Sequence, residues 1–538
     1  MISGLILRFT SPGSLKRRPV LRPRNTGKER RAIFNIVCCI LLLAANVHAQ
    51  TNSSLINFNP QQQQTIRFST AGAAIDAHDG EIAYFNGTYY LYGTSYGCGF
   101  EWGKKDAPFC GFKVYTSTDL QQWTDKGFLF DARTPVWQTR CNGSTYGCFR
   151  PHVIYNKKTK QYVLWINVYD NRIGFRVFTS QQPTGPFTEV AEPTLAVNNN
   201  GAVAGLNNGD HDTFVDEDGT AYIAYTDWQT KGTVVIEKLR ADYLTGSGEH
   251  VKAVTKGNTE APALLRRNGI YYLLYSDPNC GYCAGTGTSY RRAASPLGPW
   301  SDGVKISDQS CGGQPSFVSL IKLNGDSAFL YGSDLWNKAA KNEALANYYW
   351  APLSFAADGA IEPIICKDSI ALPLRAALPP VVKVKPDNSS GQEGFRFQCD
   401  IHGCIQRSQT FTPTRSGVLT AVSITAFKSG YPDDDLHIGI YPADDKGLPA
   451  AGKALYETAV SRDSLSWSPQ PVTIKPHITV AAKRSYVFVI RSSTGSGCYG
   501  ITYKDETPGG GAGYSADCGQ VFTIEKDRVL KFSTYVGK

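Results

Sequence analysis

Outside its first 31 residues the chain has almost no net charge. The formal charge of all 538 residues is +9, but residues 1–31 hold nine Lys or Arg residues and a single acid, Glu29, a net of +8. About +1 is therefore left for the rest of the chain. A nearly neutral body gives no electrostatic reason to expect nucleic acid as a partner.

The chain also lacks an apolar run suited to a membrane span. Residues 32–50, AIFNIVCCILLLAANVHAQ, are too short for a comfortable crossing. With the basic leader before them and the box Val47-His48-Ala49, they predict a secretory signal over residues 1–49, cleaved before Gln50. The residue directly after this box is Gln50 rather than the Cys of a lipoprotein anchor. We therefore expect a secreted protein, extracellular or periplasmic, without a stable membrane anchor.

Metal-binding cysteine patterns are missing as well. Cys280-Gly-Tyr-Cys283 matches half a zinc site, but neither a second Cys pair nor a His pair at metal spacing accompanies it. Of 14 Cys, two leave with the signal and twelve remain, which in an oxidising compartment predicts disulfides. We expect no metal and no cofactor. The pairs expected from short spacing are Cys98/Cys110, Cys141/Cys148, Cys280/Cys283 and Cys399/Cys404, with Cys498/Cys518 as a further loop-pinning pair.

What the chain has in abundance favours strands. Aromatics reach 12% and Gly numbers 52, a mix typical of strands and turns rather than helices. Five segments repeat one layout of short strand, polar turn and strand rich in Tyr and branched residues. They are DGEIAYFNGTYYLYGTS (79–95), RPHVIYNKKTKQYVLWINV (150–168), HDTFVDEDGTAYIAYTD (211–227), EAPALLRRNGIYYLLYSD (260–277) and QPSFVSLIKLNGDSAFLYGSD (314–334).

The repeats predict an all-β, five-bladed β-propeller over residues 66–373. A third strand follows each hairpin, and the units recur every 50–70 residues, roughly as propeller blades do. Residues 66–70, IRFST, are expected to supply the strand that closes the ring. Residues 50–65 and the Pro- and Ser-rich residues 374–394 are expected to be linkers. Residues 395–538 alternate with period two and predict a β-sandwich.

The innermost strand of each blade lines the axis of a propeller, so the residues that open the hairpins should converge there. These positions hold Asp79, His152, Asp210, Glu260 and Gln314. An Asp beside a strand is usually a turn or cap residue. Three carboxylates at matching positions of different blades favour a functional site instead.

These units resemble glycoside hydrolase family 43, a family of five-bladed propellers that hydrolyse glycosidic bonds with inversion. The resemblance rests on His78-Asp79-Gly80, on Asp210 in DHDTFVDEDGTAYIAY and on Glu260 in EAPALLRRNGIYYLLYS, and it covers about residues 70–370. It implies that Asp79 is the general base and Glu260 the general acid, while Asp210 orients the acid and adjusts its pKa. Asp76 is a less suited alternative base, because the family pairs His with the Asp directly after it.

The surrounding residues suggest partners for a sugar. By this resemblance the candidate substrate-binding residues are His78, Phe149, Arg150, His152, Gln314 and Trp336, with Trp102 and Trp137 as further stacking candidates. The histidines are expected to hydrogen-bond sugar hydroxyls or fix loops, and Asp212, Asp216, Glu217 and Asp218 to form a solvated turn. Trp467, Tyr431 and Tyr499 are candidates for a sugar platform on the C-terminal domain.

Within the family, SQQPTGPF, Gln314 and SDLWN resemble the exo-β-1,3-galactanase branch. That branch often has Gly after the His and is thought to use the Gln as its base, whereas this chain has both Asp79 and Gln314. We expect a monomeric, secreted inverting glycosidase that acts on oligosaccharides or polysaccharides, with plant arabinogalactan-type glycans as substrates. The alternatives are an α-L-arabinofuranosidase, a β-xylosidase or, from another class, a non-catalytic sugar-binding propeller.

Overall fold

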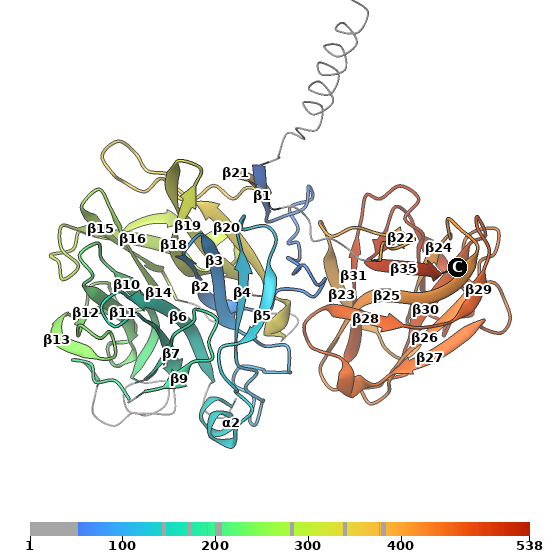
Figure 1. The fold of residues 1–538 in the computed structure, drawn as a ribbon, viewed down its shortest axis with the longest axis horizontal. Coiled ribbons are helices and arrows are strands. Elements are labelled where there is room, and N and C mark those ends of the chain that lie inside the picture. Colours follow the sequence, from blue (N-terminus) through green and yellow to red (C-terminus); the bar gives the residue numbers. More distant parts are fainter. Residues whose placement is uncertain are drawn as a thin grey trace, which may run out of the picture. The chain divides into compact units, whose positions relative to one another are not determined.

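The computed structural model describes residues 52–142, 147–168, 174–190, 192–198, 207–279, 285–336, 342–375, 377 and 384–537. The predicted signal at 1–49 and the pair Cys280/Cys283 lie outside these ranges. The regular structure within them is almost entirely strand, apart from α2 (Pro135–Cys141) and a few single 3-10 turns (Figure 1). No helix of this described part is both long and apolar enough to cross a membrane.

Five antiparallel sheets follow one another along the chain and form the predicted propeller (Figure 1). Their first strands contact one another in sequence order, and contacts between β18 and β2 complete the circle. The blades are β2 (His78–Phe85), β3 (Thr88–Thr94), β4 (Phe112–Ser117) and β5 (Thr124–Phe128); β6 (Cys148–Asn156), β7 (Gln161–Val168), β8 (Phe175–Ser180) and β9 (Thr188–Glu189); β10 (Asn208–Val215), β11 (Ala221–Asp227), β12 (Thr233–Leu239) and β13 (Gly246–Val251); β14 (Glu260–Arg267), β15 (Ile270–Ser276), β16 (Thr288–Ala293) and β17 (Val304–Ser307); and β18 (Gln314–Leu323), β19 (Asp326–Leu335) and β20 (Asn347–Pro352).

The hairpins form where the sequence predicts them. Asn86-Gly87 and Asn268-Gly269 have positive φ at both residues, as a tight type I′ hairpin turn requires. Large aromatic side chains then fill the spaces between blades, and Trp123 and Trp350 pack edge to face in the cluster between the first and last blades. The turns set the strand pairing, and the aromatic layers hold the blades against one another.

The expected ring-closing strand at 66–70 is wrong. These residues make only isolated bridges, such as Phe68 with Ala74, and the last blade has three strands. A separate two-stranded sheet instead pairs β1 (Asn52–Ile56) with β21 (Ser369–Arg375). Leu55 and Leu372 from this pair enter the apolar cluster between the first and last blades. Part of the expected linker at 50–65 therefore belongs to a sheet, because its apolar side chains are needed to cover that cluster.

The β-sandwich predicted for residues 395–538 is present over its described residues, and residues 388–389 of the expected linker at 374–394 also belong to it. One sheet contains β22 (Asn388–Ser389), β23 (Arg396–Ile401), β25 (Gly417–Ser429), β28 (Gln470–Ile474), β29 (Ile478–Val480), β31 (Cys498–Lys504), β34 (Val529–Leu530) and β35 (Phe532–Gly537). The other contains β24 (Gln406–Phe411), β26 (Leu436–Pro442), β27 (Tyr456–Val460), β30 (Tyr486–Arg491), β32 (Ala512–Ser515) and β33 (Thr523–Glu525). Both sheets contribute to a single apolar core.

The disulfides agree with the short-spacing predictions only in the propeller. Cys98–Cys110 and Cys141–Cys148 form as expected. In the sandwich the bonds are instead Cys399–Cys498 and Cys404–Cys518, so the expected Cys399/Cys404 and Cys498/Cys518 pairs are wrong. The reason is that β23 pairs with β31, which brings Cys399 beside Cys498. A fifth bond, Cys311–Cys366, spans 55 residues and was not predicted.

The predicted sugar platform on the sandwich is wrong for two of its three members. Tyr499 is fully buried in the sandwich core, and Trp467 is only 2% exposed. Tyr431 alone is open to solvent, at 54%. Stacking on a sugar requires an accessible ring face, and nothing in the sequence around these three residues showed which of them face solvent.

Candidate active site

Every blade has an irregularity at the start of its first strand, where the candidate residues lie. In β2, β6, β10, β14 and β18 the pairing with the next strand shifts by one residue, as in a β-bulge. Asp79, Arg150 and Ala261 take positive φ there, an uncommon backbone conformation for residues other than Gly. The bulges turn side chains away from the regular alternation of the strand.

The three candidate carboxylates lie at these bulges, but not at one shared position. Glu260 pairs with Ser276 before the shift, at the place that His78 has in β2. Asp79 lies one residue after that place and Asp210 two residues after its counterpart, Asn208. The prediction of matching positions is therefore correct only to within one or two residues. A bulge offers several side-chain directions, which the sequence pattern does not separate.

Asp79 is buried and bound on both oxygens. Its Oδ1 accepts from the Thr94 hydroxyl at 2.6 Å and from the Arg150 N–H at 3.3 Å, and its Oδ2 accepts from the Tyr96 hydroxyl at 2.8 Å. Gly80 beside it has no room for a Cβ, which would lie 2.2 Å from the Tyr92 carbonyl oxygen. Burial raises the pKa of Asp79 to about 6, although the Arg150 charge and the two hydroxyls oppose this.

His78 is held between two carboxylates behind Asp79. Its ring nitrogens lie 3.4 Å from Asp76 Oδ1 and 3.8 Å from Asp334 Oδ1. Burial disfavours the charged ring, but Asp334 and Asp76 outweigh it and raise the pKa of His78 to about 9. Asp334 Oδ2 also accepts from the Asp79 N–H at 3.1 Å. This group of Asp76, His78 and Asp334 fixes the backbone that presents Asp79.

The same geometry makes Asp76 a structural group rather than a base. Asp76 accepts from the Ser95 hydroxyl at 2.6 Å and from the N–H groups of Tyr96 and Gly97 at 2.8 and 2.9 Å. Burial acts against ionisation, yet the contacts with His78 and Ser95 lower the pKa of Asp76 below its usual value. A carboxylate bound in this way has little capacity left to take a proton from water.

Arg150 connects the carboxylates of different blades. Its Nη2 lies 3.0 Å from Asp210 Oδ2, and its Nη1 donates to the Ser316 carbonyl oxygen at 3.0 Å. The guanidinium is 3% exposed, and despite burial the charges of Asp210, Asp79 and other acids raise its pKa further. One buried cation thus faces several acids from separate blades, and its charge opposes the rise in the pKa of Asp79.

Glu260 is held by an amide and an indole from the fifth blade. Gln314 Nε2 donates to Glu260 Oε1 at 2.6 Å, and Trp336 Nε1 donates to Gln314 Oε1 at 3.1 Å. Phe149 lies nearby in an apolar cluster with Trp336 and packs edge to face on Phe100. The predicted residues Arg150, Gln314, Phe149 and Trp336 are therefore brought to the same region as the carboxylates.

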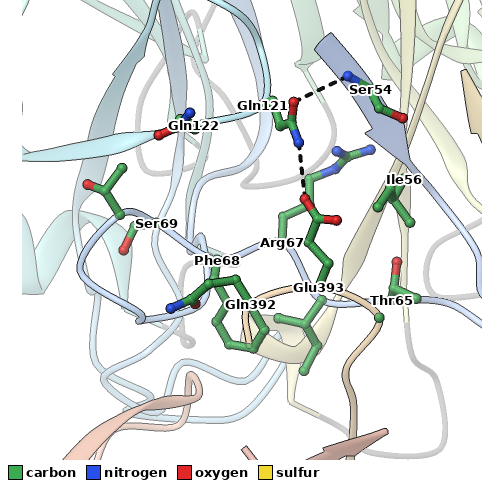
Figure 2. Close-up of a pocket in the computed structure, with 13 residues that line it drawn as sticks. Ser54, Ile56, Thr65, Arg67, Phe68, Ser69, Gln121, Gln122, Gln392 and Glu393 are labelled. Carbon is green, nitrogen blue, oxygen red and sulfur yellow. Dashed lines mark hydrogen bonds between the residues drawn. The ribbon is translucent and has the colours of Figure 1, made fainter. Parts of the chain in front are cut away.

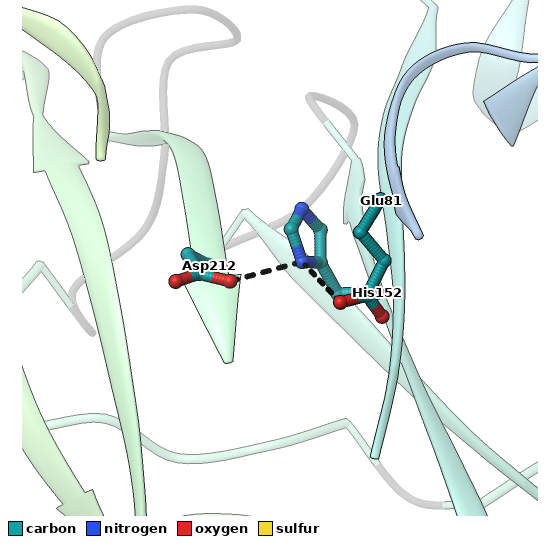
Figure 3. Close-up of side chains that lie close together, drawn as sticks. All are labelled: Glu81, His152 and Asp212. Carbon is teal, nitrogen blue, oxygen red and sulfur yellow. Dashed lines mark ion pairs between the residues drawn. The ribbon is translucent and has the colours of Figure 1, made fainter. Parts of the chain in front are cut away.

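The prediction that His78 and His152 contact a sugar directly is wrong, because both side chains are fully buried. His152 Nδ1 lies 3.1 Å from Asp212 Oδ1 and 3.6 Å from Glu81 Oε2 (Figure 3). The other oxygens of these acids accept the N–H groups of Leu264 and Val153 on the next blades. Asp212 is thus buried rather than part of a solvated turn, because this group links the blades.

Glu81, His152 and Asp212 also offer ligand atoms within 4.8 Å of one another, as a metal site would. Burial lowers the proton affinity of the ring, but Glu81 and Asp212 prevail and raise the pKa of His152 to about 9. At neutral pH the imidazole is therefore charged, which suits its place between the two carboxylates. The geometry is accounted for by a cation between two anions.

Two further stacking candidates differ in their exposure to solvent. Trp137 is buried in α2 and packs on Phe130 and Phe178 in the core between the first two blades. Its prediction as a sugar-stacking residue is wrong, because the helix directs the ring inward. Trp102 is 49% exposed and remains accessible.

The sequence reasoning did not select Thr94, Tyr96 and Asp334 as site residues. Thr94 is the last residue of β3 and Asp334 the last but one of β19, and Tyr96 lies in the loop after Thr94. They contact Asp79 and His78 at the start of the first strands because the strands are antiparallel. The available signal was a polar residue at the end of each Tyr-rich strand, as in YLYGTS and FLYGSD.

A separate pocket of about 440 Å³ lies between the N-terminal segment, the first blade and residues 392–394. Figure 2 shows Gln121 between Ser54 and Glu393: it accepts from the Ser54 N–H at 3.3 Å and donates to Glu393 Oε1 at 3.0 Å. None of the predicted site residues lines it. The candidate catalytic carboxylates therefore do not line this pocket.

The fold and site identify the propeller as the catalytic domain of a glycosidase family. Residues 71–315, most of the propeller, match the family Glycosyl hydrolases family 43. A curated relative, the β-D-galactofuranosidase xynD of Aspergillus niger, is 28% identical over 235 residues. The match covers 42% of this chain and 64% of that protein, so the chain spans less than two thirds of the relative's length.

Two solved structures are similar over most of the chain. An exo-β-1,3-galactanase from Clostridium thermocellum is 19% identical with a TM-score of 0.50, covering 90% of this chain and 97% of that one. An exo-β-1,3-galactanase from Phanerochaete chrysosporium with β-1,3-galactotriose is 19% identical with a TM-score of 0.47, covering 84% of this chain and all of that one. At 19% identity, the similarity to the Clostridium thermocellum structure supports the fold alone.

Proposed function

We propose that the protein is a secreted, inverting glycosidase that releases terminal sugars from plant arabinogalactan-type glycans, in the manner of an exo-β-1,3-galactanase. The observation that supports this best is the arrangement around Arg150. This buried cation pairs with Asp210 and interacts with Asp79 and Glu260, so three acids from three blades share one region. The galactanases that share the fold support the substrate class.

In this mechanism Asp79 takes a proton from the attacking water. Its raised pKa makes the carboxylate a stronger base than a solvated Asp, and it is ionised above about pH 6. The hydroxyls of Thr94 and Tyr96 fix its orientation, and the water binds to a remaining lone pair. An inverting enzyme needs such a base across the sugar from its acid.

Glu260 gives its proton to the leaving oxygen. Because the Gln314 amide already donates to Oε1, the proton of the acid form sits on Oε2. Asp210, through its pair with Arg150, sets the charge beside the acid. Gln314 acts here as a positioning residue, since Glu260 and Trp336 engage both ends of its amide. The base therefore remains Asp79.

The test is product release by the protein that begins at Gln50. The panel contains β-1,3-galactan, arabinogalactan, arabinan, xylo-oligosaccharides and a β-D-galactofuranoside, with Glu260→Gln as the control. Galactose or galactosyl disaccharides from β-1,3-galactan support the proposal, and NMR of the fresh product should show the anomer opposite to the substrate. Retention of configuration would contradict the mechanism.

A furanosidase is the second candidate, because the curated relative is a β-D-galactofuranosidase. Galactose from the galactofuranoside, or arabinose from arabinan, would favour it over the galactanase. A sugar-binding propeller would bind glycans without turnover, and Glu260→Gln would then leave every measured property unchanged. The five disulfides among the described residues support export to an oxidising compartment.

A further inference from the structure

The C-terminal sandwich reaches the catalytic region through the loop 465–469, between the 3-10 turn Arg462–Ser464 and β28. Trp467 in this loop is 2% exposed. It does not belong to the core of the sandwich, which consists of other residues between 401 and 536. It belongs instead to a cluster of propeller side chains that includes Tyr96, Phe149 and Trp336. A sandwich residue thus completes an apolar layer of the propeller.

Backbone hydrogen bonds fix this loop on the propeller. The Trp467 N–H donates to the Gly97 carbonyl oxygen at 2.9 Å, and the Ser466 hydroxyl donates to the same oxygen at 2.8 Å. The Asn342 side-chain amide donates to the Trp467 carbonyl oxygen at 3.1 Å. Both backbone groups of Trp467 are therefore bonded to propeller residues. Such a contact is built to a defined geometry, unlike a flexible tether.

The Trp467 indole also packs so closely against Gly99 that a side chain at this position would collide with it. A Cβ on Gly99 would lie 2.9 Å from Trp467 Nε1, and Gly99 has a φ of +104°. The Cys98–Cys110 disulfide pins the same loop from the other side. The loop after β3 is thus shaped to receive this ring.

From Gly97 and Tyr96 the contacts continue to the candidate base. The N–H groups of both residues donate to Asp76, which pairs with His78. The Tyr96 hydroxyl donates directly to Asp79 Oδ2 at 2.8 Å. Trp336, in the same cluster as Trp467, donates to Gln314, which holds Glu260. The candidate base Asp79 and the candidate acid Glu260 are thus both oriented through residues of this cluster.

We propose that Trp467 is a positioning residue for the reaction, supplied by the C-terminal domain, and that this domain is an integral part of the active site rather than an independent sugar-binding module. The kinetic consequences of this proposal rest on the proposed function. Removal of the ring should loosen Tyr96 and Trp336 and misplace the acid and the base together. A misplacement of about 1 Å can cost on the order of 100-fold in rate.

The experiment compares Trp467→Ala, Trp467→Phe and Phe411→Ala in the otherwise complete chain. Phe411 is a similarly buried aromatic residue, but its core cluster contains sandwich residues alone. Trp467→Ala should lower kcat by about 10- to 100-fold with KM changed less than about threefold. Trp467→Phe should recover most of kcat, and Phe411→Ala should keep it at a temperature where all variants are folded.

A structural role alone would not change the pH profile. Loss of the Tyr96 hydrogen bond, which favours the charged form of Asp79, should move the acid limb of kcat/KM to higher pH in Trp467→Ala. Hydrogen exchange at the Tyr96 and Gly97 amides should quicken in Trp467→Ala and stay unchanged in Phe411→Ala. The proposal would be overturned if Trp467→Ala had the same kcat, the same acid limb of kcat/KM and the same amide exchange rates as the wild type. If the wild type cleaves no glycan, the proposed function fails, and the exchange data decide this inference independently.

Discussion

Replacing Asp79 by Asn should make the protein more stable at neutral pH while abolishing its activity. The carboxyl has a pKa raised from 3.8 to about 6, mainly by burial. Between these values the folded protein holds a proton that the unfolded chain has released. Stability must therefore fall as the pH rises through this interval, and the loss is complete above pH 6.

The size of the effect follows from this rise. At roughly 1.4 kcal/mol for each pH unit, ionised Asp79 costs the fold about 3 kcal/mol above pH 6. Asn carries no charge, but its amide nitrogen is only a donor, so the hydrogen bond from either Thr94 or Tyr96 is lost, which costs about 1 kcal/mol. The variant should thus be about 2 kcal/mol more stable than wild type at pH 8 and about 1 kcal/mol less stable at pH 4.

The assay is urea unfolding of both proteins at pH 4, 5, 6, 7 and 8, analysed as the difference between them so that other ionisations cancel. Asp76→Asn is the matched control, since the pKa of Asp76 is lowered and the sign reverses. That variant should be less stable than wild type by an amount that stays nearly constant from pH 5 to pH 8, because the stabilisation by ionised Asp76 is complete above the unfolded pKa of 3.8. A difference between Asp79→Asn and wild type that stays constant from pH 4 to pH 8 would refute the reasoning.

Further predictions concern activity and cross-links. Wild-type kcat/KM should fall about tenfold per pH unit below pH 6, because protonated Asp79 cannot act as a base. A flat profile of kcat/KM down to pH 5 would exclude Asp79 as the general base. Gln314→Ala should lower kcat by about 10-fold through loss of its bond to Glu260, with Gln314→Glu failing to restore it. His152→Ala should cost about 3–5 kcal/mol in urea unfolding, since two buried acids lose their cation. Replacing Cys399 and Cys498 by Ser should cost about 4 kcal/mol of sandwich stability, because their bond closes a loop spanning 99 residues; an unchanged midpoint would contradict that bond.

Much of the fold was predictable because it depends on local signals. Hairpins form at Asn-Gly turns and strands at alternating Tyr-rich segments, so the number and order of blades follow from the chain alone. The candidate acids were likewise found from their place before each hairpin. Their exact position at each bulge was not, because a bulge is a backbone irregularity with no fixed residue type except a tolerance of positive φ.

What escaped prediction depends on contacts between distant parts of the chain. Asp334 meets His78 across 256 positions, and Trp467 bonds to Gly97 across 370. The sandwich disulfides also follow strand pairing rather than spacing in the sequence. Periodicity reports which face of a strand is buried but not what buries it, and it does not apply to a loop residue such as Trp467, which a cluster of propeller side chains buries.

The bulge at the head of each first strand has a consequence for how such a domain changes over evolutionary time. The hydrogen-bond ladder after the bulge continues in register whichever residues fill it. In this chain the bulges carry an acid in one blade, an Arg in another and an Ala beside Glu260 in a third. Reactive groups can therefore be exchanged one blade at a time without rebuilding the sheet beneath them. Duplicated blades thus give a lineage several independently variable positions around one axis.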